Sequence, residues 1–253
     1  MSQRVLITAG ASGIGLAIAQ AFAAAGAKVF VCDLDAKGLD ALKQATPGVT
    51  TAVCDISKRD NIEQMVATGV EALGGLDVLV NNAGISGPTV SVEEMNPDDW
   101  EKVVQVNLNG TFNVTRLAIP HLKKSKAGVI INMSSVAGRY GYPNRSPYST
   151  TKWGLIGFTK TLSIELGEHG IRVNAILPGA VAGERIEHVL EGRAKADHKT
   201  LEEERASAMS IQSIKRFVDP KDIAALALFL ASDAGKSISG QMLPIDNDTL
   251  KAS

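Results

Sequence analysis

Short apolar runs rich in β-branched residues recur along the chain, and segments long enough to form helices separate them. This alternation is typical of repeated strand–helix–strand units. The early runs do not alternate apolar with polar residues, which indicates parallel strands covered by helices on both faces. Right-handed crossovers between such units give a doubly wound α/β sheet. The predicted strands, about seven in number, lie at Val5–Ile7, Val29–Val31, Val49–Val53, Val78–Val80, Val129–Ile131, Val173–Leu177 and Met242–Ile245.

No internal repeat, low-complexity tract or Pro/Ser-rich linker divides the chain of 253 residues. Open α/β sheets reach this length around one core, so we predict a single domain over residues 1–253. One segment, at about 180–216, departs from the pattern. From Glu184 to Arg205 it is crowded with charges of both signs and contains no aromatic residue. We expect a mobile helical insertion over the sheet edge, where open α/β proteins bind ligands.

Charge and apolar runs exclude several kinds of partner. The formal net charge is -1, and acidic and basic residues are interspersed, so no basic stripe is present to attract nucleic acid or anionic lipid. No apolar run approaches the ~20 residues that span a bilayer, and the N-terminus lacks a signal-peptide layout. Cys32 and Cys54 each close an apolar run, which favours buried thiols over a disulfide or a metal site. We expect a cytoplasmic protein without a bound metal.

A glycine-rich turn, Thr8-Ala9-Gly10-Ala11-Ser12-Gly13-Ile14-Gly15, follows the first predicted strand directly and leads into the helical stretch Leu16–Ala25. Glycines let the backbone approach a pyrophosphate, and a helix N-terminus offers free N–H groups and a positive dipole end to it. A tight turn without a ligand is the alternative. The strand before, the helix after and an acidic residue at Asp33 supply the context that a dinucleotide site requires.

The choice of dinucleotide depends on Asp33, which ends the second predicted strand. A carboxylate there can accept hydrogen bonds from both hydroxyls of the adenosine ribose and would repel a 2′-phosphate. Ser12 and Leu34, the neighbours where a cation could neutralise such a phosphate, are both uncharged. The pattern predicts NAD rather than NADP, with a merely solvated Asp33 as the alternative.

Tyr148 and Lys152 are four residues apart in the segment Pro147–Leu166, which is predicted to be a helix opened by Ser146 and Pro147. This spacing places both side chains on one helix face. A free tyrosine has a pKa of ~10, so Tyr148 acts as a base near neutral pH only if its phenolate is stabilised by roughly 4 kcal/mol. A neighbouring ammonium and the positive nicotinamide ring of bound NAD can supply this in a water-poor cleft. The alternative is an ordinary surface pair.

Ser135 favours the catalytic interpretation of that pair. It lies at the carboxyl end of a predicted strand, thirteen residues before Tyr148. Its hydroxyl can hydrogen-bond the reacting oxygen there while Tyr148 exchanges the proton. Ser134 is the competing hydroxyl, with a structural role at the strand end as its alternative.

These motifs resemble those of the short-chain dehydrogenase/reductase family, and the likeness covers nearly the whole chain. The glycine turn is similar to the family's Thr-Gly-x-x-x-Gly-x-Gly. The resemblance implies a Rossmann-like fold that binds NAD(P) and transfers a hydride between nicotinamide and an alcohol or ketone carbon. The other matching motifs, in the family's order, are Asp55-Ile56, Asn81-Asn82-Ala83-Gly84, Asn107, Ser135, Tyr148-x-x-x-Lys152 and Pro178-Gly179.

The resemblance also implies roles for the site residues. Asn107 would hold a water that links Lys152 to solvent so that Tyr148 can be reprotonated, and Lys152 would bond the nicotinamide ribose. A solely structural role is the alternative for Asn107, because a buried amide needs partners. The expected catalytic residues are Asn107, Ser135, Tyr148 and Lys152. The expected cofactor-binding residues are Gly10, Ser12, Gly13, Ile14, Gly15, Asp33, Leu34, Asp55, Ile56, Asn82, Ala83, Gly84, Tyr148, Lys152, Pro178, Gly179 and Val181.

Four positions depart from the family's pattern. Ala9 stands where the family usually has its first glycine. Gly183 stands where a threonine often bonds the nicotinamide amide, so that bond is expected to be absent. Asn247 and Asp248 occupy positions that often hold two glycines. The conformation of the terminal turn is therefore open.

Three arginines can line the mouth of the cleft. Arg145 lies three residues before Tyr148, Arg139 lies four after Ser135, and Arg185 opens the insertion. A planar guanidinium suits a carboxylate or another anion, while ordinary surface arginines paired with Glu184 and Glu187 are the alternative. The absence of aromatic residues in the insertion argues for a small polar substrate.

The expected function is NAD-dependent interconversion of a secondary alcohol and a ketone, or of a hemiacetal and a lactone, on a sugar, sugar acid, polyol or hydroxy acid. Reduction of a 3-oxoacyl thioester is an alternative within enzymes, and a non-catalytic NAD-binding regulator is one from another class. Family likeness and the mainly apolar helix predicted around Asn107–Leu122 also lead us to expect a homotetramer or dimer built on helix-to-helix contacts.

Overall fold

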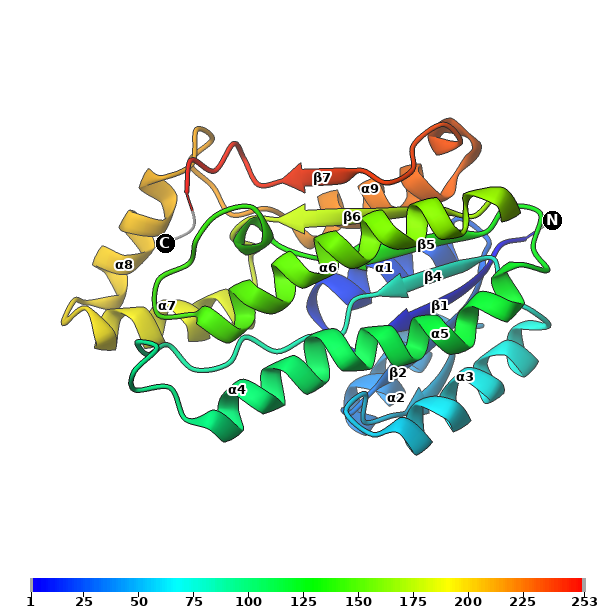
Figure 1. The fold of residues 1–253 in the computed structure, drawn as a ribbon, viewed down its shortest axis with the longest axis horizontal. Coiled ribbons are helices and arrows are strands. Elements are labelled where there is room, and N and C mark those ends of the chain that lie inside the picture. The colour runs from blue at the N-terminus through cyan, green and yellow to red at the C-terminus, as the bar shows by residue number, and fades with distance from the viewer. Residues whose placement is uncertain (1, 252–253) are drawn as a thin grey trace.

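The computed structural model describes residues 2–251 and contains a seven-stranded sheet in the order β3-β2-β1-β4-β5-β6-β7 (Figure 1). Every neighbouring pair of strands is parallel. The prediction of a doubly wound parallel sheet of about seven strands is confirmed, and each predicted run lies in a strand except for Val49 at the start of the third. The strands are β1 (Arg4–Thr8), β2 (Lys28–Asp33), β3 (Thr50–Val53), β4 (Val78–Asn81), β5 (Val129–Met133), β6 (Arg172–Pro178) and β7 (Met242–Ile245).

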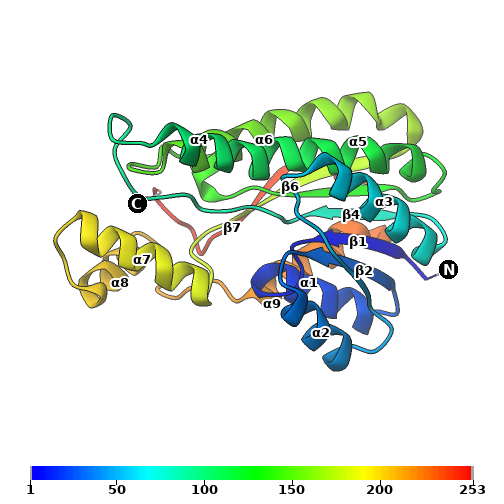
Figure 2. The same cartoon turned by 90° about the horizontal axis from the view of Figure 1, so that it is seen from below.

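Helices cover both faces of the sheet. Figure 2 shows α1, α2 and α9 on one side and α3 to α6 on the other. The helices are α1 (Gly13–Ala24), α2 (Ala36–Ala45), α3 (Arg59–Leu73), α4 (Pro97–Val104), α5 (Thr111–Leu122), α6 (Ser146–Glu165), α7 (Glu184–Ala196), α8 (Leu201–Ser210) and α9 (Pro220–Ala231). Three short 3₁₀ turns lie at Val136–Gly138, Gly167–His169 and Asp233–Gly235.

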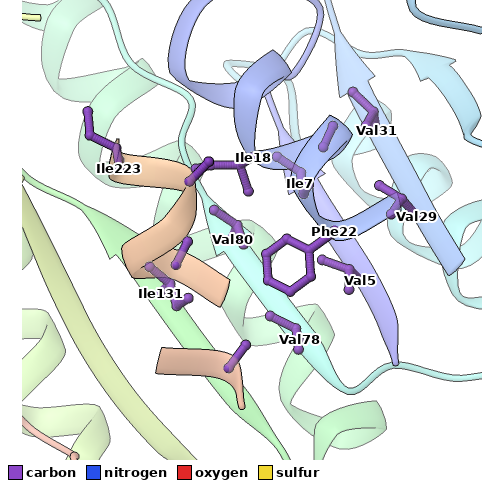
Figure 3. Close-up of a cluster of buried hydrophobic side chains, with 14 of the residues drawn as sticks. Val5, Ile7, Ile18, Phe22, Val29, Val31, Val78, Val80, Ile131 and Ile223 are labelled. Carbon is purple, nitrogen blue, oxygen red and sulfur yellow. The ribbon is translucent and has the colours of Figure 1, made fainter. Parts of the chain in front are cut away.

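The central strand β1 explains why the early runs are apolar without alternation. Val5 and Ile7 belong to the core cluster on the α1 side, where Phe22 and Ile223 also lie (Figure 3). Leu6 belongs to the cluster on the opposite face. Successive side chains of a strand point to opposite faces, so a strand covered on both sides buries every one of them. Each such side chain stabilises the fold by roughly 1.5–3 kcal/mol.

The long helix predicted around Asn107–Leu122 is interrupted. A π-helical turn, Gln105–Gly110, separates α4 from α5, and Asn107 lies inside this turn. Such bulges insert one extra residue into the helix and are frequent at functional sites. No helix within residues 2–251 is long and apolar enough to cross a membrane.

The segment at about 180–216 forms α7 and α8, which extend past the carboxyl ends of the strands (Figures 1 and 2). Thr200 caps α8 with a capping box that includes Glu203. An ion pair between Arg205 and Glu187 joins the two helices. The predicted helical insertion is therefore present over the edge of the sheet, and its mobility stays a prediction.

Candidate active site

A cleft of about 980 Å³ opens at the carboxyl ends of the strands, beneath α7 and α8. Parallel strands of an open sheet end at this edge, where ligands of such folds bind. Five of the residues predicted for the site do not line the cleft: Gly10, Gly15, Asp55, Asn107 and Arg139. Those that do are Ser12, Gly13, Ile14, Asp33, Leu34, Ile56, Asn82, Ala83, Gly84, Ser135, Arg145, Tyr148, Lys152, Pro178, Gly179, Val181 and Arg185.

The glycine turn after β1 is held in place by the loop after β4. The Asn82 side chain donates to the carbonyls of Ala9 (2.8 Å) and Thr8 (3.1 Å). A Cβ on Gly15 would lie 2.2 Å from the Ala9 carbonyl oxygen, so this position accepts only glycine. Ala9 has a φ of 54°, in the left-handed region. A glycine, which the family usually has here, takes this conformation freely, whereas alanine is strained in it.

At the far end of the cleft, Asp33 is hydrogen-bonded on both carboxylate oxygens. Oδ2 accepts from the backbone N–H of Ala11 (2.9 Å), and Oδ1 accepts from that of Asp35 (3.1 Å). Each carboxylate oxygen can accept more than one hydrogen bond, so both keep capacity for a ligand hydroxyl. The Leu34 side chain is 66% exposed beside it. A Cβ on Gly10 would lie 2.6 Å from the Val31 side chain, so Gly10 fits the turn against β2.

Asp55 makes local contacts instead of facing the cleft. Its Oδ1 accepts from the N–H of Ser57 (2.9 Å) and from the Ser57 hydroxyl (2.7 Å), and the hydroxyl holds the pKa of Asp55 below its ordinary value. Ile56 lines the cleft in its place. Cys32 and Cys54 are free, buried thiols next to this end, as predicted.

Tyr148 and Lys152 lie on the cleft side of α6. The Lys152 ammonium is 5.6 Å from the centre of the Tyr148 ring and donates to the carbonyl of Met133 (2.7 Å). Burial lowers the pKa of Lys152 to about 8. Burial alone would raise the pKa of Tyr148, but Lys152, Arg185, the Ser135 hydroxyl and Arg145 together hold it below the ordinary value.

The two serines after β5 have different partners. Ser134 donates from its hydroxyl to the carbonyl of Lys152 (2.8 Å), and a Cβ on Gly138 would clash with that hydroxyl at 2.6 Å. Ser134 therefore fixes α6 against β5. Ser135 faces the cleft, and its hydroxyl stabilises the Tyr148 phenolate.

Asn107 is completely buried and its amide is bonded to the protein on both sides. Its Oδ1 accepts from the N–H of Ile85 (2.7 Å), and its Nδ2 donates to the Ile85 carbonyl (3.0 Å) and to the Thr151 hydroxyl (3.1 Å). A Cβ on Gly84 would lie 3.2 Å from Asn107 Oδ1 and 3.4 Å from Lys152 Nζ, so the lack of a side chain on Gly84 leaves open a position close to both the amide and the ammonium. The amide joins the loop after β4 to α6.

The three predicted arginines do not lie together. Arg139 is exposed, lies over the ring of Tyr140 at 5.2 Å and is outside the cleft. The structure thus departs from the expectation that Arg139 lines the cleft mouth, because its side chain is exposed to solvent and is not part of the cleft lining. Arg145 is only 2% exposed and donates to the carbonyl of Ser86 (2.9 Å). Arg185 on α7 lies 5.9 Å from the Tyr148 ring.

Tyr142 and Arg193 also line the cleft, although neither was among the predicted site residues. Arg193 donates a hydrogen bond to the Tyr142 hydroxyl. A signal was present in the sequence: Arg185, Val189 and Arg193 are spaced by four, which places them on one face of a helix. All three line the cleft.

Backbone conformation explains which residues stand at the positions that depart from the family's pattern. Gly183 has a φ of 136°, which side-chain-bearing residues rarely adopt, so the backbone at this position suits glycine and offers no hydroxyl. Asn247 (φ 55°) and Asp248 (φ 56°) take the left-handed conformation, which asparagine and aspartate tolerate better than most residues. The terminal turn thus keeps a conformation that glycines allow, and Thr249 after it lines the cleft.

A family model described as short chain dehydrogenase matches residues 3–193, from β1 into α7. The chain belongs to this family. Short-chain dehydrogenases are oxidoreductases that use a nicotinamide cofactor, and this chain acts on a CH–OH group or its carbonyl counterpart. Among residues 2–251 there is no cluster of three or more His, Cys, Asp or Glu side chains that could hold a metal ion.

Similar short-chain dehydrogenases act on different substrates. The chain is 40% identical over 245 residues to a 3-oxoacyl-(acyl-carrier-protein) reductase of Thermotoga maritima, covering 95% of each chain. It is 36% identical over 247 residues to a D-beta-hydroxybutyrate dehydrogenase of Cupriavidus necator, again covering 95% of each. The crystal structure of an actinorhodin polyketide ketoreductase with NADPH is 34% identical, with a TM-score of 0.92 and coverage of 97% and 96%. That of an NAD+-bound xylitol dehydrogenase is 28% identical, with a TM-score of 0.92 and coverage of 96% and 97%.

Proposed function

We propose that this short-chain dehydrogenase uses NAD to interconvert a secondary alcohol and a ketone, or a hemiacetal and a lactone, on a small polar substrate. Sugars, sugar acids, polyols and hydroxy acids are the candidate substrates. The observation that carries the proposal is the arrangement of Tyr148, Lys152 and Ser135 on the cleft floor, with the pKa of Tyr148 held below its ordinary value.

Each of these three residues has its own part in the mechanism. The Ser135 hydroxyl hydrogen-bonds the reacting oxygen, and the Tyr148 phenolate removes the proton from the alcohol during oxidation. The Lys152 ammonium, 5.6 Å from the Tyr148 ring centre, stabilises this phenolate. In the direction of reduction, the Tyr148 hydroxyl returns the proton to the carbonyl oxygen. The nicotinamide of the bound dinucleotide supplies or accepts the hydride.

The turn after β1 fits a pyrophosphate. Gly13 has a φ of 53° and open space where a Cβ would stand, so the backbone N–H groups at the start of α1 are accessible. Residues Ser12 to Gly15 would hold the pyrophosphate, Asp33 the adenosine ribose, and Lys152 the nicotinamide ribose. Asn107 would hold a water between Lys152 and solvent, for which its Oδ1 keeps one lone pair.

Preference for NAD over NADP rests on Asp33. The carboxylate keeps acceptor capacity for two ribose hydroxyls, whereas a 2′-phosphate would meet a like charge. Titration of the purified protein with NADH and NADPH, followed by nicotinamide fluorescence, tests this preference. Equal or tighter binding of NADPH would show that Asp33 does not contact the ribose.

A 3-oxoacyl-thioester reductase is the second candidate, favoured by the 40% identity to the Thermotoga maritima reductase. The titration above also bears on this alternative, because a preference for NADPH would favour it. All three of Ser135, Tyr148 and Lys152 are present in the cleft, which argues against a non-catalytic NAD-binding regulator.

The surface of α5 and α6 fits an interface between copies of this chain. Phe112, Trp153 and Ile164 leave large apolar side chains exposed on these helices. We propose a homodimer or homotetramer that buries this surface. The free thiols of Cys32 and Cys54 suit the reducing cytoplasm.

The experiment that tests the proposed function is an NAD-reduction screen of the purified protein across sugars, sugar acids, polyols and hydroxy acids. Absorbance of NADH reports turnover directly. Oxidation of at least one of these classes, lost in Tyr148→Phe, is the expected result. A protein that reduces a 3-oxoacyl thioester with NADPH and oxidises none of these classes would replace the proposal by its alternative.

A further inference from the structure

Three arginines converge on two tyrosines at the mouth of the cleft. The guanidinium carbon of Arg145 is 5.3 Å from the ring centres of both Tyr142 and Tyr148. That of Arg193 is 5.1 Å from the Tyr142 ring, and that of Arg185 is 5.9 Å from the Tyr148 ring. The two rings lie edge to face with centres 6.3 Å apart. The positive charges are therefore gathered next to the acid/base tyrosine.

Within the described part of the chain, no ion pair compensates this charge. None of the ion pairs found within residues 2–251 involves Arg145, Arg185 or Arg193. Burial and the two other arginines lower the pKa of Arg145, which shows that the three charges disfavour one another. Arg205 on α8, in contrast, forms an ion pair with Glu187 on α7.

The buried arginines also have unused donors. The Nε atoms of Arg145 and Arg193 are buried and have no hydrogen-bond partner in the described part of the chain. Arg145 spends one of its five N–H donors on the Ser86 carbonyl, and Arg193 spends one on the Tyr142 hydroxyl. A buried donor without an acceptor costs roughly 1–3 kcal/mol, so the cluster is complete only when an anion supplies acceptors.

We propose that Arg145 and Arg193 bind the carboxylate of the substrate, which identifies the substrate class as a small hydroxy acid and the corresponding oxo acid. The inference rests on the proposed dehydrogenase function. A carboxylate matches the planar guanidinium fork with two parallel hydrogen bonds. The Tyr142 hydroxyl, which accepts from Arg193, is free to donate its own proton to the same carboxylate.

The position of the cluster limits the size of this acid. Arg145 lies at the same distance from the rings of Tyr142 and Tyr148, so a carboxylate bound to it lies beside the reacting carbon. A small hydroxy acid, in which the carboxylate is close to the alcohol carbon, matches a guanidinium this near the Tyr148 ring. Arg185 on α7, 5.9 Å from the centre of the Tyr148 ring, adds a third positive charge.

Matched pairs of substrates test the inference. 3-Hydroxybutyrate and lactate are compared with their neutral methyl esters and with 1,3-butanediol and 1,2-propanediol, in the NAD-reduction assay. We expect kcat/KM for the acid to exceed that of its neutral counterpart by about 10- to 100-fold, the range of a charge-assisted hydrogen bond. Neutral alcohols turned over as well as the acids would overturn the inference and leave the dehydrogenase function intact.

Arg193→Gln is the decisive variant, because the side chain is only half-buried on α7 and its loss does not disturb the core. It should raise KM for the hydroxy acid about 10- to 100-fold and leave NADH binding unchanged. Arg193→Lys keeps the positive charge but not the planar guanidinium, so its KM for the hydroxy acid should lie between those of the wild type and Arg193→Gln. Arg139→Gln, outside the cleft, is the matched control and should behave as wild type. An unchanged KM for the acid in Arg193→Gln would exclude a carboxylate site at this cluster.

A binding measurement separates failure of the inference from failure of the function. Calorimetric titration of the NADH-bound protein with butyrate, which has the carboxylate but no alcohol, is expected to show binding that Arg193→Gln weakens by at least 10-fold. Butyrate binding without oxidation of any alcohol would support the anion site and overturn the dehydrogenase. Oxidation of polyols without butyrate binding would support the dehydrogenase function and overturn the anion site.

Discussion

At the residue scale, two opposing effects meet at Tyr148. Burial favours the neutral phenol, while Lys152, Arg185 and Arg145 favour the phenolate, and the positive charges prevail. The same burial lowers the pKa of Lys152 to about 8, so the ammonium loses its proton in the slightly alkaline range. The phenol and the ammonium therefore titrate as an interacting pair.

Tyr148→Phe removes only the hydroxyl. We expect kcat to fall by at least the ~10²–10⁴ typical of general acid–base catalysis, while NADH binding survives. Steady-state kinetics and a fluorescence titration measure the two quantities. A folded Tyr148→Phe enzyme with near wild-type turnover would mean that another group in the cleft accepts the proton.

Lys152→Ala should differ from that variant in a defined way. The ammonium is assigned two roles, one toward the phenolate and one toward the nicotinamide ribose, so its loss should lower kcat and also weaken NADH binding. Circular dichroism serves as the folding control, because Lys152 also bonds the Met133 carbonyl. Unchanged NADH affinity would remove the ribose contact from the assignment.

The pH dependence follows from the lowered pKa of Tyr148. Oxidation needs the phenolate, so its rate should rise as pH increases through this pKa, at a pH below ~10. Reduction needs the phenol and should fall over the same range. Profiles of kcat/KM in the two directions test this, and an oxidation rate that shows no ionisation below pH ~10 would contradict it.

Ala9→Gly tests the strain in the turn after β1. Alanine at a φ of 54° is strained by roughly 1–2 kcal/mol, and glycine removes this strain. The greater freedom of glycine in the unfolded chain destabilises the variant by about 0.5–1 kcal/mol and so offsets part of the gain. A net gain of up to ~1.5 kcal/mol in the free energy of unfolding is expected, measured by urea denaturation. The control is Ala23→Gly within α1, which should destabilise the protein by about 0.5–1 kcal/mol.

At the element scale, the π-helical turn places Asn107 against the loop after β4. Three hydrogen bonds of its amide join Ile85 and Thr151, which belong to different elements. In an uninterrupted α-helix from α4 to α5, every residue after the turn would be rotated about the helix axis by the angle between two successive residues. The bulge therefore allows a buried amide and the apolar face of α5 to point inward together.

Asn107→Ala should leave the partly buried N–H and carbonyl of Ile85 without their side-chain partner. We expect the free energy of unfolding to fall by about 1–3 kcal/mol, the cost of an unsatisfied buried polar group. Thermal and urea denaturation measure the loss. An Asn107→Ala protein that keeps full stability and loses only turnover would assign the amide to proton transfer alone.

Site residues that belong to one helix or turn could be predicted from the sequence better than those placed by a change in chain direction. The turn after β1, Asp33, and the Tyr148–Lys152 pair are local patterns on single elements, so spacing was sufficient to place them. Arg139 lies four residues after Ser135 and Arg145 lies three before Tyr148, yet only Arg145 lines the cleft. Asn144 has a left-handed φ of 58°, so the chain direction changes just before Arg145. The number of residues between two positions does not reveal such a change in chain direction.

Arg193 illustrates the other limit. Its place in the cleft depends on how α7 docks over the sheet, which is set by contacts between segments far apart in the sequence. The strand runs, in contrast, predicted the sheet almost completely, because strands buried on both faces have an apolar composition that packing requires at every position.

At the scale of the whole molecule, the outer surface of α5 and α6 predicts self-association. The Ile164 side chain is 81% exposed, and Phe112 and Trp153 are about half exposed on the same pair of helices. Multi-angle light scattering at micromolar concentration should report a dimer or tetramer. Phe112→Glu should shift it toward the monomer, with Leu34→Glu, exposed elsewhere, as the control. A monomeric wild type at concentrations that support activity would contradict the prediction.

The crossover topology has a consequence for synthesis of the chain. β1 to β3 and the turn that fits the pyrophosphate are complete after about a fifth of the sequence, whereas the residues that close the cleft include Thr249, whose carbonyl accepts from Tyr140. Domains acquire structure from the N-terminus as they leave the ribosome, and long-range parallel pairing is slow. The turn is held by Asn82 after β4, and the cleft also includes Lys152 and Thr249, so the complete site forms only after nearly the whole chain has been made, and we expect turnover to begin only when β7 has docked against β6.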